Sequence, residues 1–433
     1  MRRVVITGMG VVTPIGNELT SFWDNLISGK CGVGALTRFD TTNYKVKIAA
    51  EVKGFDPTLY MEKNQVRKMD LYCQYGVAAA AMAMKDSNLA EFSDGTRGTV
   101  TIKGVEPDRM GVYVGSGIGG MNTFVNETEK LLKEGPSRVS PFFVPMMIGN
   151  IAAGTIAIEY DAQGPCLPVV TACATGSHAI GEAFHAIRAD RADVIIAGGC
   201  EASITPIAVA GFTNCMALSK RNDPTCASIP FDKRRDGFVI AEGAGIVILE
   251  ELEHARKRGA KIYGEIIGYG NTCDAYHITA PDPNAKGAAN SITIALKEAF
   301  YQNPEYEKMV KDSGSIYINA HGTSTPLNDR TETLAIKKAL GEELAYRVMV
   351  SSTKSMTGHM LGAAGAVEVI VATKAMIEGI IPPTIGYVEK DEDCDLDYVP
   401  NVARKAMPDL ALSTSLGFGG HNACIAIKPA RLI

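Results

Sequence analysis

The feature that most constrains the fold is an internal repetition along the chain. Three short patterns occur in the same order in its first and second parts: a strand followed by Gly-x-Gly, a strand and a Thr/Ser-rich turn before an Ala-rich helix, and a glycine cluster that runs into an apolar strand. They occupy residues 4–10 and 266–270, 169–176 and 350–358, and 242–248 and 417–425. Repetition of this kind indicates a duplicated unit. We therefore predict two similar halves, residues 1–259 and 260–433.

Short β-branched runs alternate with Ala-rich segments along the chain. The runs at 4–6, 112–114 and 194–197 read as strands, whereas 177–189 and 363–377 have helical composition. This alternation is typical of helices packed against mostly parallel sheets, so the predicted fold class is α/β. Hydrophobic residues make up 46% and charged residues 21% of the chain, which supplies a core and excludes a disordered or coiled-coil chain.

The charge balance bears on possible partners. The chain has 43 Lys and Arg against 48 Asp and Glu, a formal net charge of −5. This lacks the basic excess of a nucleic-acid or membrane surface, so we expect neither partner. The apolar run at the start is broken by Thr7, Gly8 and Gly10, and no stretch of about 18 apolar residues follows, which argues against a signal peptide or membrane span. A cytoplasmic location is the expectation.

Cys173 differs in context from the other nine cysteines, which are scattered without a C-x-x-C pair or histidines at metal-ligand spacing. We expect no metal site and reduced thiols. Cys173 lies between the apolar run 167–170 and a helix predicted to begin near Thr175. The positive end of a helix stabilises a thiolate, so we predict a nucleophile with a lowered pKa. The alternative is a small buried residue.

Two histidines have comparable contexts in the second half. His321 follows an apolar strand within a small-residue loop, the position at which α/β proteins hold ligands. His359 lies at the turn that matches the Cys173 region, so the pseudo-symmetry predicts that His359 and Cys173 are close together. Each alone could be a structural histidine, but together they indicate a catalytic site.

Three other motifs have simpler interpretations. Residues 114–120 fit G-x-G-x-x-G, but the acidic residue about 20 positions later, Glu134, falls in the polar stretch 130–136 and does not end a second strand. A tight loop is therefore a better interpretation than a dinucleotide site. The acidic run 391–397 lacks the glycine and glutamate of a calcium loop and is interpreted as a surface loop. Lys63, Arg67 and Lys68 form a basic patch, either a solvated helix face or a dock for an acidic partner.

The sequence resembles the β-ketoacyl-acyl-carrier-protein synthases, most closely the type II elongating enzymes of bacterial fatty acid synthesis. The resemblance runs from Val4 to Lys428 and rests on residues 171–174, 319–325, 352–359 and 417–420. It implies a thiolase-like fold, in which two duplicated halves form a layered αβαβα core, and a homodimer.

The resemblance also implies the reaction and its central residues. Cys173 would accept an acyl chain from the phosphopantetheine of an acyl carrier protein as a thioester. His321 and His359 would bind the malonyl thioester and stabilise the enolate formed as carbon dioxide leaves. The enolate would attack the Cys173 thioester and lengthen the chain by two carbons. Neither a metal nor a separate cofactor is implied.

Further roles follow from the same resemblance. The N–H groups of Cys173 and Phe418 would form an oxyanion hole, and Phe418 would be a gate within the mobile glycines that include Gly419. Lys354 and Glu332 would belong to a supporting polar network. Thr323 and Thr325 would contact the pantetheine. Lys63, Arg67 and Lys68 would dock the acidic carrier.

The chain departs from the family pattern at several places. Leu416 and His421 replace the usual residues around the gate, and both bear on how the gate packs and moves. Phe124 stands where a smaller aliphatic residue is common, so its ring is predicted to shorten the acyl chain that fits the tunnel. Residues 98–107 form an extra polar segment.

Alternatives remain at this stage. A thiolase would need a second catalytic cysteine near the C-terminus, but Cys424 lies within an apolar strand. An initiating synthase with Cys, His and Asn is disfavoured by His359. A ketosynthase of a polyketide or aryl-polyene pathway would carry the same catalytic residues. A non-catalytic partner subunit that binds the carrier would lack the nucleophile.

Overall fold

One mixed sheet of nine strands organises the computed structural model, which describes residues 1–301 and 303–433. Its order is β11-β10-β14-β15-β9-β1-β8-β7-β6. The strands are β11 (Met349–Ser351), β10 (Ile316–Asn319), β14 (Leu410–Gly417), β15 (His421–Pro429), β9 (Gly264–Cys273), β1 (Val4–Val12), β8 (Gly243–Glu251), β7 (Val194–Glu201) and β6 (Met110–Gly115).

The order and direction of the strands are pseudo-symmetric. β6 and β7 pair in parallel, as do β10 and β14, and the edge strand β11 also pairs in parallel with β10. The remaining strands of each part pair antiparallel. The two parts meet where β1 pairs with β9, over the three residues Val4 to Ile6. This arrangement confirms the predicted α/β class and the duplication. The expectation of mostly parallel sheets is wrong, because five of the eight strand pairings in this sheet are antiparallel and three are parallel.

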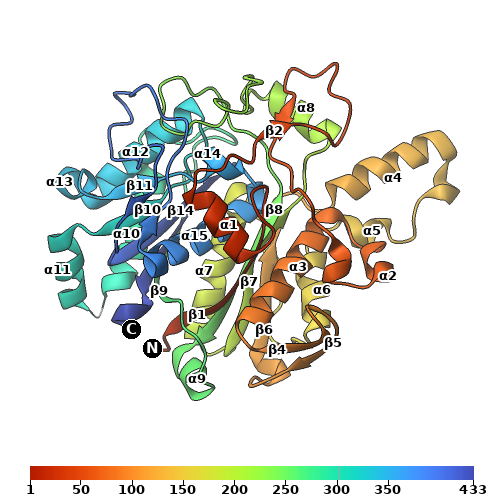
Figure 1. Cartoon of the computed structure of the whole chain (residues 1–433), viewed down its shortest axis with the longest axis horizontal. Helices are drawn as coiled ribbons and strands as arrows, with labels where there is room; N and C mark the ends of the chain where they lie inside the picture. Colours follow the sequence, from red (N-terminus) through yellow and green to blue (C-terminus); the bar gives the residue numbers. More distant parts are fainter. Residues whose placement is uncertain (302) are drawn as a thin grey trace.

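Helices divide the structure into layers (Figure 1). α3 (Leu71–Asp86) and α6 (Ile151–Glu159) pack on the outer face of the first part of the sheet, and α10 (Lys286–Phe300) and α12 (Pro326–Leu340) on that of the second. α7 (Thr175–Arg188) and α15 (Ala364–Glu378) share a central hydrophobic cluster with the inner faces of both parts. The result is the predicted αβαβα core.

The central helices are apolar on nearly every side because strands or helices surround them. α15 carries Ala, Val and Ile at successive positions, and residues 364–373 are all buried. A helix that is hydrophobic all round is expected only where it is enclosed. The alternation of β8 fits the same plan, since Val247 and Leu249 face the central cluster while Ile246 and Ile248 face the outer one.

Equivalent turns introduce the two central helices. A single 3-10 turn, Ala172–Ala174, precedes α7, and another, Leu361–Ala363, precedes α15. The first residue of each turn has a positive φ, 50° at Ala172 and 48° at Leu361. Non-glycine residues seldom adopt this conformation, and it concentrates at functional sites.

The remaining elements decorate this core. α4 extends away from the body in Figure 1, and the predicted extra polar segment lies largely within a surface hairpin formed by β4 and β5. They are α1 (Leu19–Ile27), α2 (Lys63–Val66), α4 (Met121–Glu134), α5 (Phe143–Met147), α8 (Pro206–Asn214), α9 (Leu252–Lys257), α11 (Pro304–Ser313), α13 (Glu342–Ala345), α14 (Lys354–Thr357), β2 (Gly34–Ala35), β3 (Ile48–Ala49), β4 (Ala90–Asp94), β5 (Arg97–Ile102), β12 (Ile380–Ile381) and β13 (Arg404–Lys405).

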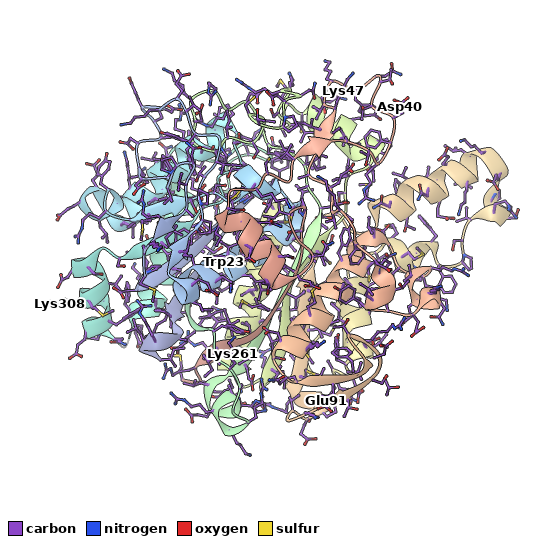
Figure 2. All side chains as sticks on the ribbon, viewed as in Figure 1. Trp23, Asp40, Lys47, Glu91, Lys261 and Lys308 are labelled. Carbon is purple, nitrogen blue, oxygen red and sulfur yellow. The ribbon has the colours of Figure 1, made fainter. Side chains whose placement is uncertain are left out.

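The surface carries most of the charge. In Figure 2, Asp40, Lys47, Glu91 and Lys308 lie at the periphery, whereas Trp23 of α1 is buried in the central cluster. Among the helices that the structure describes, none is long and apolar enough to cross a membrane.

Candidate active site

One cavity of about 270 Å³ brings together the side chains that the sequence singled out. It lies where the starts of α7 and α15 meet the loop after β10 and the hairpin between β14 and β15. Its predicted members are Cys173, His321, His359, Thr323, Thr325 and Phe418. Residues that are distant in the sequence therefore form one pocket, as the pseudo-symmetry predicted.

Cys173 occupies the 3-10 turn before α7. Burial raises the pKa of its thiol to about 12, although the positive charge of Lys354 and the backbone N–H of Phe418 act in the opposite direction. The predicted lowering of this pKa is therefore wrong. Desolvation outweighs the helix end and the nearby lysine, so the resting side chain is a neutral thiol.

The two histidines face each other across the pocket. Their ring centroids are 5.3 Å apart, with the ring planes nearly perpendicular, and both side chains are almost fully buried. Burial and the charge of Lys354 hold both pKa values well below the usual range. Each ring is therefore a neutral imidazole, able to donate one N–H.

Backbone hydrogen bonds hold the two loop segments that carry the histidines. Glu332 of α12 accepts hydrogen bonds from the backbone N–H groups of His321 and Gly322, both at 2.7 Å. The N–H of His359 donates to the carbonyl of Val239 at 2.8 Å. The structure thus places Glu332 beneath the His321 loop, as a support outside the cavity wall.

Lys354 and Glu368 form an ion pair behind the histidines, and both side chains are almost completely buried. Burial raises the pKa of Glu368 to about 7, while Lys354 acts to lower it. Sequence reasoning missed Glu368. The available signal was a single acidic residue within the apolar stretch Ala364 to Ala372, since a buried charge needs a partner.

The hairpin between β14 and β15 carries Phe418 over the pocket. Gly419 and Gly420 have φ values of 85° and 78°, which favour glycine. A Cβ at Gly417 would lie 3.3 Å from the backbone nitrogen of Cys173, so the hairpin backbone rests directly on the nucleophile turn. His421, which departs from the family pattern, places its imidazole beside Gly419: a Cβ on Gly419 would lie 3.1 Å from this ring.

Thr323 and Thr325 stand at the pocket wall, with their hydroxyl oxygens 3.0 Å apart. Phe124 lies elsewhere, partly exposed on α4, and is not among the residues that line this cavity. Lys63, Arg67 and Lys68 are exposed at α2, where the Lys68 ammonium lies 5.3 Å above the Phe142 ring. Gly419 is exposed at the tip of the hairpin.

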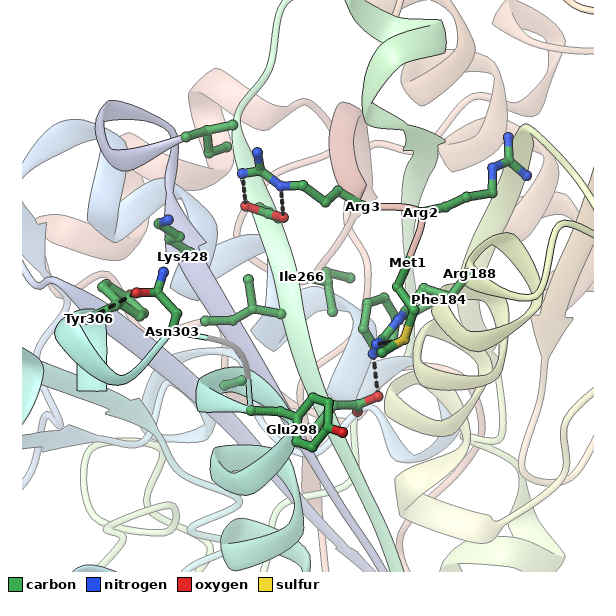
Figure 3. A pocket seen from close by; sticks show the side chains of 15 residues that line it. Met1, Arg2, Arg3, Phe184, Arg188, Ile266, Glu298, Asn303, Tyr306 and Lys428 are labelled. Atoms are coloured by element: carbon green, nitrogen blue, oxygen red, sulfur yellow. Dashed lines mark hydrogen bonds and ion pairs between the residues drawn. The ribbon is translucent and has the colours of Figure 1, made fainter. Parts of the chain in front are cut away.

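A second cavity, of about 330 Å³, lies near the chain ends (Figure 3). Two ion pairs lie within it, Arg3 with Glu265 and Arg188 with Glu298. It contains neither a cysteine nor a histidine. Among the residues that the structure describes, no cluster of His, Cys, Asp and Glu is arranged to hold a metal.

A layered α/β core that presents Cys173, at the turn before a helix, and two neutral histidines in a single pocket is the arrangement of a thiol-dependent acyl-transferring enzyme. Comparison with known proteins agrees. Residues 1–255 match the β-ketoacyl synthase N-terminal domain, and residues 263–388 match the C-terminal domain. The chain belongs to the β-ketoacyl synthase family.

Individual relatives extend over the whole chain. A 3-oxoacyl-[acyl-carrier-protein] synthase 2 of Synechocystis sp. is 50% identical over 99% of this chain and 98% of its own length. Its counterpart from Coxiella burnetii is 47% identical with the same coverage. A chain in the structure of a type II polyketide acyl-carrier protein in complex with its ketosynthase is 35% identical, covers 99% of each chain, and has a TM-score of 0.85.

Proposed function

We propose that this protein elongates fatty acyl chains by decarboxylative condensation of an acyl group on Cys173 with malonyl-acyl-carrier protein. The carrying observation is that Cys173 shares one pocket with two neutral imidazoles. The relatives about half identical over nearly the full length are synthases that act in this way.

The first step is acyl transfer. The Cys173 sulfur attacks the carrier thioester, the bond to the pantetheine sulfur breaks, and the thiol proton ends on that sulfur. The oxyanion of the tetrahedral intermediate would be bound by the backbone N–H groups of Cys173 and Phe418. The close contact of Gly417 with the nucleophile turn supports this assignment.

The second step is condensation. The malonyl carboxylate leaves as carbon dioxide, and its bonding electrons form an enolate on the thioester. His321 and His359 would each donate an N–H to the enolate oxygen. The enolate carbon then attacks the Cys173 thioester, a carbon–carbon bond forms, and the Cys173 sulfur leaves and takes up a proton.

Lys354 supports this chemistry electrostatically. Its positive charge disfavours protonation of both imidazoles. A neutral ring donates its one N–H to the enolate oxygen, and it lacks the acidic proton of an imidazolium, which would quench the enolate carbon. Glu368 stabilises the buried ammonium in return.

The carrier would reach the site from the basic patch. Lys63, Arg67 and Lys68 are exposed and complement an acidic partner, and Thr323 and Thr325 would bind its pantetheine arm. The likeness to a ketosynthase structure containing its acyl carrier protein supports this assignment.

A second copy of the chain would cover the exposed apolar face near β6. Leu167 donates its N–H to the carbonyl of Val112 of β6. Its side chain, that of Val170 and that of Ile158 on α6, which packs on β6, are exposed. Exposed apolar patches beside a sheet edge mark interaction sites.

Phe124 lies on α4, and its proposed effect on the length of the accepted acyl chain is tested by acyl-chain competition with Phe124→Ala.

The division of the chain is also proposed. α9 ends at Lys257 and β9 begins at Gly264, which supports a boundary between residues 259 and 260. The two units would be an N-terminal half with the nucleophile and a C-terminal half with both histidines.

Intact-mass analysis tests the function. Wild type and Cys173→Ala are incubated with acyl-carrier proteins of several chain lengths, and malonyl-carrier is then added. The expected result is a Cys173-dependent acyl adduct that disappears into a product two carbons longer. Absence of an adduct with every donor would favour a non-catalytic carrier-binding subunit. Turnover only with polyketide intermediates would favour a polyketide or aryl-polyene ketosynthase.

A further inference from the structure

Glu201 at the end of β7 is a completely buried carboxylate that the mechanism above does not use. One of its oxygens, Oε1, accepts from the hydroxyls of Ser116 and Ser203, both at 2.9 Å. The other, Oε2, accepts from the backbone N–H groups of Gly117 at 2.9 Å and Gly362 at 3.1 Å. Four donors therefore converge on one buried group.

The two backbone donors belong to different halves of the chain. Gly117 lies in the loop after β6, and a Cβ on it would lie 3.4 Å from the carbonyl oxygen of Ala172, the residue before the nucleophile. Gly362 lies in the 3-10 turn three residues after His359. Through Oε2, Glu201 links the loop beneath Cys173 to the turn that follows His359.

There is no free space at this junction. A Cβ on Gly362 would lie 2.4 Å from the Gly117 nitrogen and 2.9 Å from Oε2 of Glu201. The two loops are therefore in direct backbone contact, and the carboxylate bridges their N–H groups. Removing the bridge would leave a buried backbone donor at Gly362 and a partly buried one at Gly117 without this partner.

Glu201 also affects the site through its charge. Its negative charge acts to raise the pKa of the Cys173 thiol, whereas its hydrogen bonds counteract the raising effect of burial on its own pKa. A carboxylate kept only for stability at this place would disfavour thiolate formation at Cys173 without a compensating benefit. The benefit that the structure offers is the bridge between the Gly117 loop and the Gly362 turn.

We propose that Glu201 is a positioning residue that holds the Cys173 turn and the His359 turn at the separation that carbon–carbon bond formation requires. The inference rests on the proposed function. Acyl transfer depends on the Cys173 turn, and decarboxylation on the histidines. Only condensation needs both at a fixed separation, and a misplacement of about 1 Å can cost roughly 100-fold in rate.

Two conservative variants separate reach from charge. Glu201→Asp keeps the charge but, one methylene shorter, cannot reach both backbone N–H groups. Glu201→Gln keeps the reach: its carbonyl can accept from Gly117 and Gly362 while its amide donates to the two serine hydroxyls. Glu51→Ala is the matched control, because Glu51 is a mostly buried carboxylate that accepts from Thr37 and Arg38 away from the pocket.

Three rates are measured for each folded protein: acylation of Cys173 by acyl-carrier, decarboxylation of malonyl-carrier alone, and the complete condensation. For Glu201→Asp we expect both partial reactions within about threefold of wild type and condensation lowered about 30- to 100-fold, with Glu201→Gln within about fivefold throughout. Glu51→Ala should leave the three rates in their wild-type ratio.

Other outcomes overturn the inference. If Glu201→Asp lowers all three rates equally, Glu201 is merely structural. If Glu201→Gln loses condensation while Glu201→Asp retains it, the charge matters and the positioning does not. If wild type itself forms no acyl adduct, the proposed function fails, and that result is independent of the variants.

Discussion

The turn before α7 and the turn before α15 have the same backbone and different tasks. Both are 3-10 turns whose first residue has a positive φ, and both begin a helix enclosed in the central layer. The first carries its reactive group, Cys173, within the turn. The second acts through His359, just before the turn, and through Glu368, on the helix beyond it. The shared backbone thus sets the geometry, and different side chains divide the chemistry.

Replacement of Cys173 by Ala is the strongest way to separate the two turns. The first turn then has no nucleophile, so we expect condensation to fall by at least about 10⁴-fold. The second turn is unchanged, and decarboxylation of malonyl-carrier should persist. Measuring carbon dioxide release beside product formation checks this, and loss of both activities would contradict the division of tasks.

Loss of Lys354 should have the next largest effect. Lys354→Met leaves Glu368 without its buried partner, which costs about 3–5 kcal/mol in the free energy of unfolding. Denaturant unfolding measures this cost. In the double variant Lys354→Met/Glu368→Gln most of the stability should return, and a double variant no more stable than Lys354→Met would show that the pair is not the cause.

His359→Ala tests the second turn directly. Removing one donor to the enolate should lower decarboxylation by about 10²- to 10³-fold, while acylation of Cys173 continues. Intact-mass measurement of the adduct and carbon dioxide release report the two steps separately. His185→Ala, at an exposed histidine that does not line the cavity, is the control. Equal loss of acylation would place His359 in both steps.

The pH dependence follows from the buried imidazoles. Because the pKa values of His321 and His359 lie well below 6.5, the folded protein keeps both rings neutral as the pH falls through that value. Decarboxylation should therefore stay nearly constant from pH 8 to 6. The unfolded chain does bind these protons near pH 6.5, so stability is complete above that pH and falls below it, by up to ~1.4 kcal/mol per unit for each histidine. A midpoint of activity loss near pH 6.5 would contradict neutral donors held by burial.

Alkylation of Cys173 should show the smallest effect, but it tests the pKa of the Cys173 thiol most directly. With a pKa of about 12, the thiolate fraction rises about tenfold per pH unit through pH 10. The iodoacetamide reaction followed by mass spectrometry should show that rise, whereas an ordinary thiol levels near pH 8.5. If the reaction rate of Cys173 also levels off near pH 8.5, its thiol pKa is not raised by burial, and the lowered pKa predicted from the helix end would be correct.

Sequence patterns identified the fold class and the three central residues because repetition and strand-to-loop positions are local signals. They misjudged the Cys173 pKa because the degree of burial depends on the hairpin and the second half of the chain, which approach only in three dimensions. Glu368 and Glu201 were missed for the same reason: each is defined by donors that are distant in the sequence. Phe124 is not among the residues that line the cavity, and it is exposed on α4, which extends away from the body in Figure 1.

The enclosure of α7 and α15 has a consequence for the newly made chain. α7 packs against strands from both halves, and β9, β14 and β15 are synthesised after it. While the ribosome is still producing the second half, the apolar side of α7 has nothing to cover it. The core can close only near chain termination, so nascent chains should need chaperone protection until their last strand, β15, has emerged.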